Sequence, residues 1–343
     1  MKKKLSIASI ASQLNISTAT VSFILNGKAK EKKISEALEK KVIAYVDKVG
    51  YRPNRMAQGL RTGKSKIIGM LIEDISDPFF SSIARQVEEN AVLNGYHIIY
   101  GSTENEPVKT LDLLQIFRHH QVDGYIIAPP PGIESAIRDL VEEGLPVVLF
   151  DRKLKELDTD VVEVDNFDGT LSAMEHMIAN GFRNIAMITL TSDQNQMNDR
   201  VSAYEQAMSD NDLPSLVKKI TYHAEREKSV KIIQNFLKLN KNMDAVFFAT
   251  NYIAINGLEA IKRSHLTIGR DLGVIAFDDS ISFELFTPSI TAIAQPINDI
   301  STAVISKMLE RLTSQADDTA NIYSTKTLHT VLIERESSAP LRK

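Results

Sequence analysis

The sequence of 343 residues contains no cysteine. This absence excludes disulfide bonds, thiol catalysis and cysteine-ligated metal sites, and it is typical of proteins kept in a reducing cytoplasm. A continuous apolar run long enough to span a membrane is also lacking. Near the beginning of the sequence, Ser6, Ser9 and Ser12 interrupt the apolar residues at helical spacing, unlike the continuous core of a secretory leader. We therefore expect a cytoplasmic protein with no membrane partner.

Sequence motifs of the common enzyme classes are absent as well. The chain has no dinucleotide-binding G-x-G-x-x-G, no phosphate-binding P-loop, no H-E-x-x-H zinc motif and no G-x-S-x-G nucleophile. Two of the seven histidines are adjacent, His119 and His120, but a helical pattern there turns their rings apart. We therefore expect no enzyme activity, no metal and no cofactor.

Positive charge is concentrated in the first 65 residues and is scarce elsewhere. Residues 1–65 contain 14 Lys and Arg against 4 Asp and Glu, a net charge of +10, which leaves −14 for residues 66–343. A basic segment is often only a solvated surface, but Lys and Arg also bind the phosphates of nucleic acids by releasing condensed counterions. The asymmetry favours a two-part protein in which the basic segment contacts DNA and the acidic part does not.

Three short amphipathic helices are predicted in the basic segment. Ser6 and Ser17 are suitable N-caps for two helices that only Asn15 and Ile16 separate, which is the spacing of a helix-turn-helix. The apolar residues of these helices fall on one face of each, at Ile7, Ile10, Ala11 and Leu14 and at Val21, Ile24 and Leu25. A third helix is predicted from about residue 35 to residue 49. Any helical hairpin can show this pattern, but together with the charge it predicts a DNA-binding domain over residues 1–50.

Residues 51–65, Y-R-P-N-R-M-A-Q-G-L-R-T-G-K-S, join the basic segment to the acidic body. Pro53 disfavours a helix, Asn54 can cap one, and residues 55–60 could form barely two turns, too short to be stable alone. Two motifs, I-A-S-Q-L-N-I-S-T-A-T-V-S-F-I-L-N-G and G-Y-R-P-N-R-M-A-Q-G-L, make a family resemblance specific. They resemble the DNA-binding domain and hinge of the LacI/GalR family of transcription regulators, to which the whole chain is similar.

The resemblance implies how this region meets DNA. Two linkers of a dimer would fold as hinge helices on the operator, and Leu60 would enter the minor groove as a wedge beside Ala57, unless it only packs against the body. Thr18 and Ala19 match the two family positions that read base edges, and Phe23 matches a third, where its ring could instead join the core or contact a thymine methyl. The predicted DNA-contacting residues are Ser6, Ser17, Thr18, Ala19, Thr20, Ser22, Phe23, Asn26, Tyr51, Asn54, Arg55, Ala57 and Leu60.

From Lys66 onward, short apolar runs alternate with helical patterns. The runs are I-I-G-M-L-I, H-I-I-Y-G, Y-I-I-A-P, V-V-L-F-D, I-A-M-I, A-V-F-F-A and V-I-A-F-D. Such runs separated by amphipathic helices indicate parallel sheets covered on both faces, and roughly nine or ten strands favour two doubly wound subdomains. The resemblance implies the type I periplasmic-binding-protein fold, with chain crossings near Asp165, Ala294 and Ser324. The expected architecture is an all-α helix-turn-helix domain, a linker at 51–65 and an α/β body at 66–343 that binds effector and dimerises.

Candidate effector contacts lie at the ends of these runs, because ligands of doubly wound sheets bind beyond the carboxyl ends of the strands. Asp77-Pro78-Phe79-Phe80 follows the first run and resembles the family's N-P-F-F, with aspartate in place of the usual asparagine. Four further polar residues match effector-contacting positions of the family, although each alone is more often a loop cap or a surface charge. The predicted effector-contacting residues are Asp77, Phe79, Asp151, Arg200, Asn251 and Asp278.

The sequence also departs from the family's pattern. Tyr252 stands where the family often has aspartate, and no aromatic platform for a sugar ring is identifiable near Arg226. A ring could come instead from Tyr222, His223 or Phe286, although an aromatic residue is more often part of the core. The segment T-P-S-I-T-A-I-A-Q-P, residues 287–296, also matches the family. The match favours a structural role at a crossing between the subdomains, and Gln295 is a candidate for linking the cleft to an interface.

We interpret the chain as a homodimeric, ligand-responsive transcription regulator, most simply a repressor. It would bind a palindromic double-stranded DNA operator, with an affinity set by a small carbohydrate-like effector. A solute-binding receptor with the same body fold is the alternative, but it gives no reason for a basic helix-turn-helix. The residues do not decide whether the effector is an inducer or a corepressor.

Overall fold

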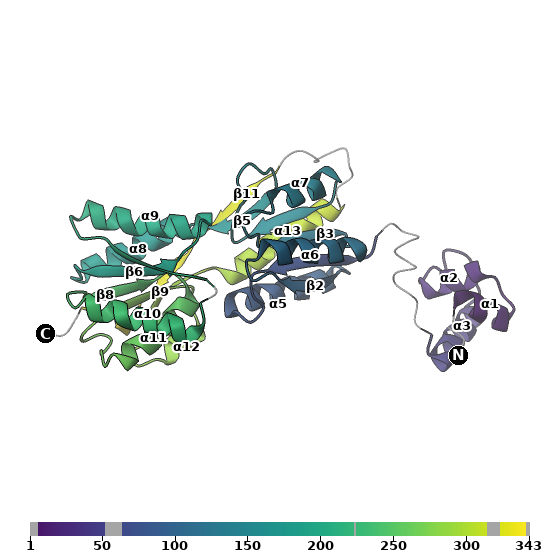
Figure 1. Cartoon of the computed structure of the whole chain (residues 1–343). Coiled ribbons are helices and arrows are strands. Elements are labelled where there is room, and N and C mark those ends of the chain that lie inside the picture. Colours follow the sequence, from purple (N-terminus) through teal and green to yellow (C-terminus); the bar gives the residue numbers. More distant parts are fainter. Residues whose placement is uncertain (1–5, 52–63, 223, 314–322, 341–343) are drawn as a thin grey trace. The chain divides into compact units, whose positions relative to one another are not determined.

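The computed structural model describes residues 6–51, 64–222, 224–313 and 323–340. The chain forms two compact units that divide between Ser65 and Lys66. The first unit, called the head below, is helical, and the second, called the body, is an α/β structure (Figure 1).

The head contains the three predicted helices, α1 (Ile7–Leu14), α2 (Thr18–Leu25) and α3 (Glu36–Val49). Each begins after a serine whose side chain accepts a hydrogen bond from the first turn, namely Ser6, Ser17 and Ser35. Asn15 ends α1 and Gly50 ends α3, both with a positive φ that stops the helix. The helix-turn-helix expectation is therefore confirmed in its local details.

The core of the head is built from the apolar faces that the sequence pattern indicates. Its fully buried side chains come from all three helices and the α2–α3 loop: Ile10, Ala11, Val21, Ile24, Ala29, Val42 and Val46. Among the described residues no single helix is long and apolar enough to cross a membrane, and α1 and α2 meet that test only as a pair bent by 111°.

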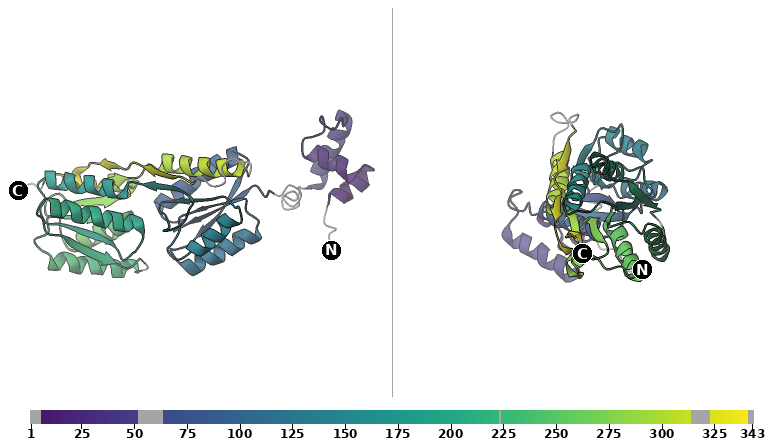
Figure 2. Two further views of the ribbon diagram at one scale, coloured as in Figure 1. Left: turned by 90° about the horizontal axis from the view of Figure 1, so that it is seen from above. Right: turned by 90° about the vertical axis from the view of Figure 1, so that its left-hand side faces the viewer.

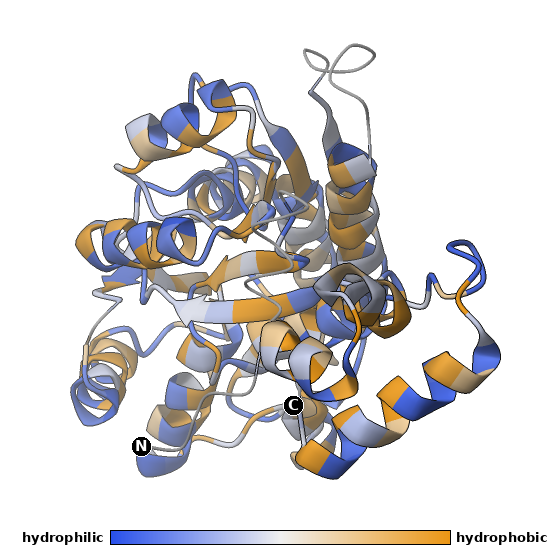
Figure 3. Cartoon of the chain, turned by 90° about the vertical axis from the view of Figure 1, so that its right-hand side faces the viewer, coloured by the Kyte–Doolittle hydropathy of each residue, from blue (hydrophilic) through white to orange (hydrophobic). Residues whose placement is uncertain are grey.

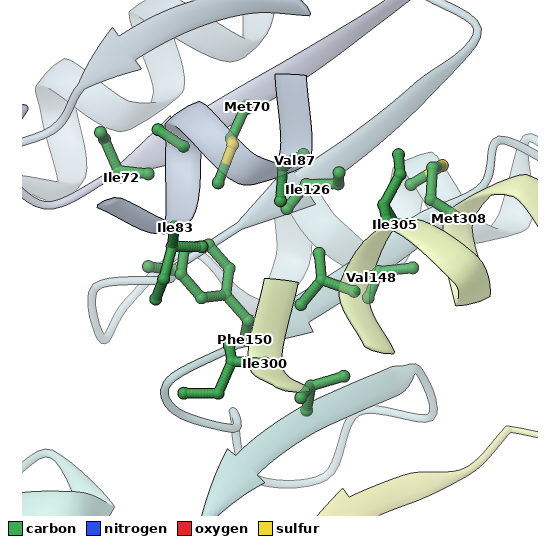
Figure 4. Close-up of a cluster of buried hydrophobic side chains, with 14 of the residues drawn as sticks. Met70, Ile72, Ile83, Val87, Ile126, Val148, Phe150, Ile300, Ile305 and Met308 are labelled. Carbon is green, nitrogen blue, oxygen red and sulfur yellow. The ribbon is translucent and has the colours of Figure 1, made fainter. Parts of the chain in front are cut away.

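The first subdomain of the body is a parallel sheet of six strands in the order β11-β5-β4-β3-β1-β2 among the described residues. Its elements are β1 (Ile67–Ile72), α5 (Pro78–Leu93), β2 (His97–Ser102), α6 (Pro107–His119), β3 (Gly124–Ile127), α7 (Glu134–Glu142), β4 (Val147–Phe150), β5 (Asp160–Val164), α13 (Ile297–Thr313) and β11 (Thr325–Leu328). Helices α5 and α13 cover one face, and α6 and α7 cover the other. Figure 4 shows side chains of β1, β3, β4, α5 and α13 meeting in the first of these cores.

The second subdomain repeats this topology with the strand order β12-β10-β9-β8-β6-β7, in which only β12 pairs antiparallel among the described strands. Its elements are α8 (Asn166–Ala179), β6 (Ile185–Leu190), α9 (Asn195–Asp210), β7 (Leu216–Ile220), α10 (Arg226–Leu239), β8 (Ala245–Phe248), α11 (Asn251–Arg263), β9 (Gly273–Phe277), α12 (Ile281–Leu285), β10 (Thr291–Ala294) and β12 (Val331–Ile333). Figure 2 shows the two subdomains side by side, each with helices on both sides of its sheet. The predicted pair of doubly wound sheets is confirmed.

The central strands are apolar along their whole length because helices cover both faces of each sheet. All four residues of β3, β4 and β8 are buried. Figure 3 shows the corresponding contrast in hydropathy, with hydrophobic strands inside the body and helices that mix hydrophobic and hydrophilic residues. The alternation of apolar runs and amphipathic helices therefore follows directly from this layered packing.

The described chain crosses between the subdomains three times. The first crossing is at Asp165, the second is at residues 295–296 after β10, and the third is at His329 and Thr330, between β11 and β12. The third differs from the expected position near Ser324, because that residue precedes β11, which completes the first sheet before the chain crosses. Asp165 accepts a hydrogen bond from the amide of Thr330 at 2.7 Å, so that the first and third crossings are tied together.

Candidate functional site

A cleft between the two subdomains lies at the carboxyl ends of both sheets. Each sheet reverses its strand order beside β1 or β6, and such switch points are where doubly wound sheets bind ligands. The cleft contains about 390 Å³ of atom-free space, part of which is open to solvent. It is lined by Glu73, Asp77, Phe79, Phe80, Asp151 and Arg152 of the first subdomain, by Leu190, Gln194, Gln196, Met197, Arg200, Thr250, Asn251, Tyr252 and Asp278 of the second, and by Gln295 of the second crossing.

A larger depression of about 950 Å³ lies at the amino ends of β6, β7 and β8. Exposed side chains line it, among them Lys238, Lys241 and Leu239. Because no buried polar groups converge there, we regard the smaller cleft as the candidate ligand site.

The structure brings all six predicted effector residues into this cleft. Asp77 is the N-cap of α5, and its side chain accepts from the Phe79 amide at 2.8 Å. Asp151 and Asp278 directly follow β4 and β9, and both have φ of 68°, so that corresponding strands of the two sheets end in the same left-handed turn. Asn251 opens α11. The contact of these residues with a ligand remains a prediction.

Arg200 of α9 anchors the second subdomain's side of the cleft. Its guanidinium is 2% exposed, donates to Asn166 Oδ1 at 2.9 Å and to the Ala249 carbonyl at 2.6 Å, and lies over the Phe277 ring. Asp278 Oδ2 is 3.7 Å from its Nη1. Burial lowers the pKa of Arg200, whereas the nearby Asp278 carboxylate acts in the opposite direction. The side chain is thus both a brace of the strand ends and a fixed positive charge facing the cleft.

Arg152 has the corresponding role in the first subdomain. Its guanidinium is 3% exposed and donates to Asp151 at 2.8 Å, to Asn105 at 2.8 Å and to Glu73 at 2.6 Å. Burial acts to lower the pKa of Arg152, but Asp151 and Glu73 outweigh it and hold the pKa above its ordinary value. All three nitrogens of this guanidinium therefore already have acceptors within the protein.

Burial disfavours the ionised form of two carboxyl groups of the cleft, those of Asp77 and Asp278. Burial, together with the nearby charges of Asp278 and Glu73, raises the pKa of Asp77 to about 6 against the opposing hydrogen bonds from the Phe79 amide and Asn251. Burial also raises the pKa of Asp278, while Arg200 and a 2.6 Å hydrogen bond from Gln295 oppose the shift. A ligand that donates hydrogen bonds or carries positive charge would offset this effect of burial.

Three polar contacts cross the cleft and join the subdomains. Asn251 Nδ2 donates to Asp77 Oδ1 at 3.4 Å, and Gln194 Nε2 donates to Asn105 Oδ1 at 3.2 Å. Tyr222, which follows β7, hydrogen-bonds to the Glu73 carboxylate that follows β1. The observed arrangement is therefore a closed one, held by contacts that a ligand entering the cleft would have to replace.

Two cleft side chains have acceptor atoms that nothing in the described structure satisfies. The Oε1 atoms of Gln196 and Gln295 are buried and receive no hydrogen bond from described residues. Because burying an unpaired acceptor costs roughly 1 to 3 kcal/mol, these atoms indicate a ligand that supplies donors. Within the part of the chain that the structure describes, no group of three or more side chains is arranged to hold a metal ion.

The structure also places the aromatic candidates. Tyr222 packs edge-to-face on Tyr252, with ring centroids 6.2 Å apart, and Tyr252 lines the cleft. Phe286 is partly exposed at the end of α12, and Arg226 pairs on the surface with Glu259 at 2.6 Å. His223 lies outside the described residues. Tyr252, Phe79 and Phe80 are therefore the aromatic residues that line the cleft.

The candidate nucleic-acid interface is the outer face of α2. Thr18 and Ala19 are exposed in its first turn, where neither side chain contributes to the core. Phe23 is half-buried outside the buried core cluster, and the Lys32 ammonium lies 5.5 Å from its ring centroid, so that the alternative of a core role does not apply. This face carries a hydroxyl, a methyl and a ring, and their contact with base edges remains a prediction.

Other predicted DNA contacts also stabilise the head. Ser6 and Ser17 are N-caps, the Ser17 hydroxyl lies 2.8 Å from that of Thr20, and Asn26 donates to the Ser22 carbonyl at 2.6 Å. Tyr51 packs against the core of the head. The remaining predicted DNA contacts, Asn54, Arg55, Ala57 and Leu60, fall in the linker segment that the structure does not describe.

Five polar residues of the cleft are not predicted from the sequence: Glu73, Arg152, Gln194, Gln196 and Thr250. Glu73 directly follows the first apolar run, so that its position at a strand end is a signal that could have identified it. Arg152 points into the cleft because Asp151 before it has a left-handed backbone, which the sequence does not reveal. The glutamines lie at and just inside the start of α9 and show no distinguishing pattern.

Comparison with known proteins covers both units of the chain. Residues 6–54 match the family of bacterial regulatory proteins named after lacI, and residues 174–338 match the periplasmic binding protein-like domain. The HTH-type transcriptional regulator RegA of Clostridium saccharobutylicum is 30% identical over 336 residues, which cover 97% of this chain and 99% of that protein. The similarity to this regulator thus spans both the head and the body.

Two solved structures resemble the fold. The lac repressor dimer bound to operator and the anti-inducer ONPF has a TM-score of 0.84 at 20% identity, covering 98% of this chain and 100% of that chain. A periplasmic binding protein/LacI transcriptional regulator from Alkaliphilus metalliredigens, complexed with D-xylulofuranose, has a TM-score of 0.68 at 25% identity, covering 79% and 98%. The first likeness includes the head, and the second extends over the greater part of the chain.

Proposed function

This chain belongs to the LacI family of bacterial regulatory proteins, and we propose that a polyhydroxylated small molecule in the body cleft sets its affinity for a palindromic operator. Membership makes the chain a DNA-binding transcriptional regulator, as its sequence indicates. The alternative of a solute-binding receptor without a transcriptional role is not supported, since the head itself matches the family. The relatives are transcriptional regulators and not enzymes.

The proposed class of effector rests on the surplus of hydrogen-bond acceptors in the cleft. Gln196 and Gln295 each have a buried oxygen without a described donor, and four carboxylates line the same cavity. Arg152 already donates within the protein from all three nitrogens, which leaves few donors for an anionic ligand. A sugar-like molecule offers several hydroxyl donors and fits such a site. The D-xylulofuranose held by one relative supports this class.

The proposed mechanism is a free-energy coupling between cleft and linker. The cross-cleft contacts of Asp77 with Asn251 and of Asn105 with Gln194 stabilise one relative orientation of the subdomains. An effector that replaces them favours its own orientation, and the spacing of the two linkers of a dimer would change with it. We assign residues 1–50 to DNA binding, 51–65 to the linker, and 66–343 to effector binding and dimerisation.

A second copy of the chain is the proposed partner of the body. The short helix α12 leaves Ile281 and Leu285 about 76% and 80% exposed at positions i and i+4, so that a second copy packed against this helix would cover both apolar side chains. A related fold was solved as a dimer on operator DNA. Leu285→Ser should weaken self-association in sedimentation equilibrium, whereas Lys238→Ser, on the exposed end of α10, should not.

The experiment that tests the proposed function uses the full-length protein. An operator is first selected from random duplexes by the protein itself, and a panel of sugars, sugar acids, nucleosides and amino acids is screened by thermal shift. We expect a sugar-like compound both to stabilise the protein and to change operator affinity, measured by fluorescence anisotropy. A stabilising compound from another class that alone changed operator affinity would contradict the proposed effector class.

A further inference from the structure

The charged groups of the cleft do not balance. Four carboxylates line it, those of Glu73, Asp77, Asp151 and Asp278, against the guanidiniums of Arg152 and Arg200. Arg152 pairs with both Glu73 and Asp151, and Arg200 lies 3.7 Å from Asp278. The ion pairs thus satisfy three carboxylates and leave a local excess of negative charge.

Asp77 is the carboxylate without a cation. No ion pair between described residues includes it, and its neighbours Asp278 and Glu73 are both negative. Both of its hydrogen bonds, from the Phe79 amide and from Asn251, go to Oδ1. No described residue donates to Oδ2, so that this oxygen is available to a ligand.

Aromatic rings complete the surroundings of Asp77. Phe79 and Phe80 follow it after Pro78, their ring centroids are 5.0 Å apart, and both residues line the cleft. Tyr252 follows the Asn251 that hydrogen-bonds to Asp77, and it lines the cleft as well. Carboxylates together with aromatic faces are the groups that proteins use to hold an ammonium group.

We propose that the effector carries a protonated amine, as an amino sugar does, and that Asp77 receives its ammonium group. The ammonium would supply the missing positive charge and donate to Oδ2, while the hydroxyl groups of the same molecule meet the acceptors of Gln196 and Gln295. This inference rests on the proposed function, because it specifies the chemistry of the effector within the same cleft.

Matched sugars test the proposal by isothermal titration of the full-length protein in an amine-free buffer at pH 7.5. The probes are glucosamine, galactosamine and mannosamine, each compared with its parent hexose and its N-acetyl derivative, in which the amine is neutral. We expect at least one amine to bind at least tenfold more tightly than both of its partners. Tenfold corresponds to about 1.4 kcal/mol, within the range of one charge-assisted contact.

Asp77→Asn is the decisive variant, because asparagine has the same shape and can still cap α5. It should reduce the preference for the amine over its parent hexose to less than twofold. Asp112→Asn, which removes the same charge from the exposed face of α6, should leave the preference unchanged. An unchanged preference in Asp77→Asn would overturn the role of Asp77.

The pH dependence provides a readout that a merely structural aspartate would not give. Since the pKa of Asp77 is about 6, its protonation at pH 5 should weaken binding of the amine severalfold relative to pH 7.5, even though the amine itself is more fully protonated at pH 5, with little change for the hexose. A hexose that binds at least as tightly as its amine in every pair would overturn this inference and leave the proposed effector class standing. Failure of all nine probes to bind would count against both.

Discussion

Replacing Asp77 by asparagine should stabilise the ligand-free body at neutral pH. Burial and the charges of Asp278 and Glu73 raise the pKa of Asp77 from 3.8 to about 6. A carboxyl whose pKa is higher in the folded state than in the unfolded state destabilises the fold once it ionises. The cost is absent below pH 3.8, where both states are protonated, and it is fully present above pH 6. Asparagine removes the charge and with it the cost.

The magnitude follows from the size of the shift. A pKa difference of about 2 units corresponds to roughly 3 kcal/mol, since each unit is worth about 1.4 kcal/mol. Two effects reduce this figure, because Asp77 is not fully buried and because an ionised N-cap gains roughly 0.3 to 1 kcal/mol from the helix dipole of α5. We expect a net gain of about 1 to 2 kcal/mol at pH 7.5, or roughly 2–6 °C in melting temperature for a body of this size.

The assay is thermal unfolding of the wild-type chain, Asp77→Asn and Asp112→Asn at several pH values without ligand. The stabilisation by Asp77→Asn should fall to about a third of its full value at pH 4.5 and approach zero below pH 3.8, because the unfolded carboxyl also takes up its proton there. The Asp112→Asn control should show no comparable trend, since that residue is exposed on α6. Destabilisation at pH 7.5, or a gain that does not change with pH, would refute the reasoning.

Three further outcomes follow from the division of charge and from the cleft. A chain that begins at Lys66 should lose operator binding in a gel-shift assay and keep its effector affinity in calorimetry, and retained operator binding would contradict the two-part assignment. The intact protein should lose operator affinity steeply with salt, at a slope for roughly 6 to 10 phosphate contacts, and a flat titration would contradict phosphate binding by the head. Arg200→Ala and Asp278→Asn should each weaken effector binding about tenfold or more, with the larger fall in melting temperature for Arg200→Ala because its buried hydrogen bonds are lost. Normal effector affinity in a folded Asp278→Asn protein would refute the cleft assignment.

The central strands of the body could be predicted because their burial on both faces requires a continuous apolar run in the sequence. Helices cover both faces of β4, β8 and β9, so that V-V-L-F, A-V-F-F and V-I-A-F are apolar throughout. The strand β7, L-V-K-K-I, lies at the edge of its sheet, where lysines are tolerated and discourage pairing with other chains. Edge strands such as β7 therefore show no apolar run, and the apolar V-L-I of β12 is only three residues long.

The cleft was predictable only where chemistry and strand position coincide. Asp151 and Asp278 end apolar runs, and parallel sheets bring such ends together. The pairing of Glu73 with Arg152 depends on the left-handed turn at Asp151, and that of Glu73 with Tyr222 depends on the closure of the two subdomains. Neither the left-handed turn at Asp151 nor the closure of the subdomains can be inferred from the local sequence. The position of the third crossing was missed for a related reason, since β11 is polar and resembles a loop.

The geometry of closure sets a requirement on any effector. The contact between Asp77 and Asn251 is 3.4 Å long, near the limit of a hydrogen bond, so that a ligand can replace it at little cost. A ligand bound to one subdomain alone has equal affinity for open and closed forms and shifts nothing. To change the ratio of closed to open molecules from 1:99 to 99:1, a ligand must bind the closed form about 5.5 kcal/mol more tightly than the open form. Two to four charge-assisted contacts of roughly 1.5 to 3 kcal/mol each can supply this difference. These contacts must come from both sides, with Asp77 on α5 and Asp278 held by Gln295 at the second crossing. Because α13 continues from that crossing and packs against α5, the two carboxylates belong to one connected structure. An effector that bridges them therefore acts directly on the relative orientation of the subdomains.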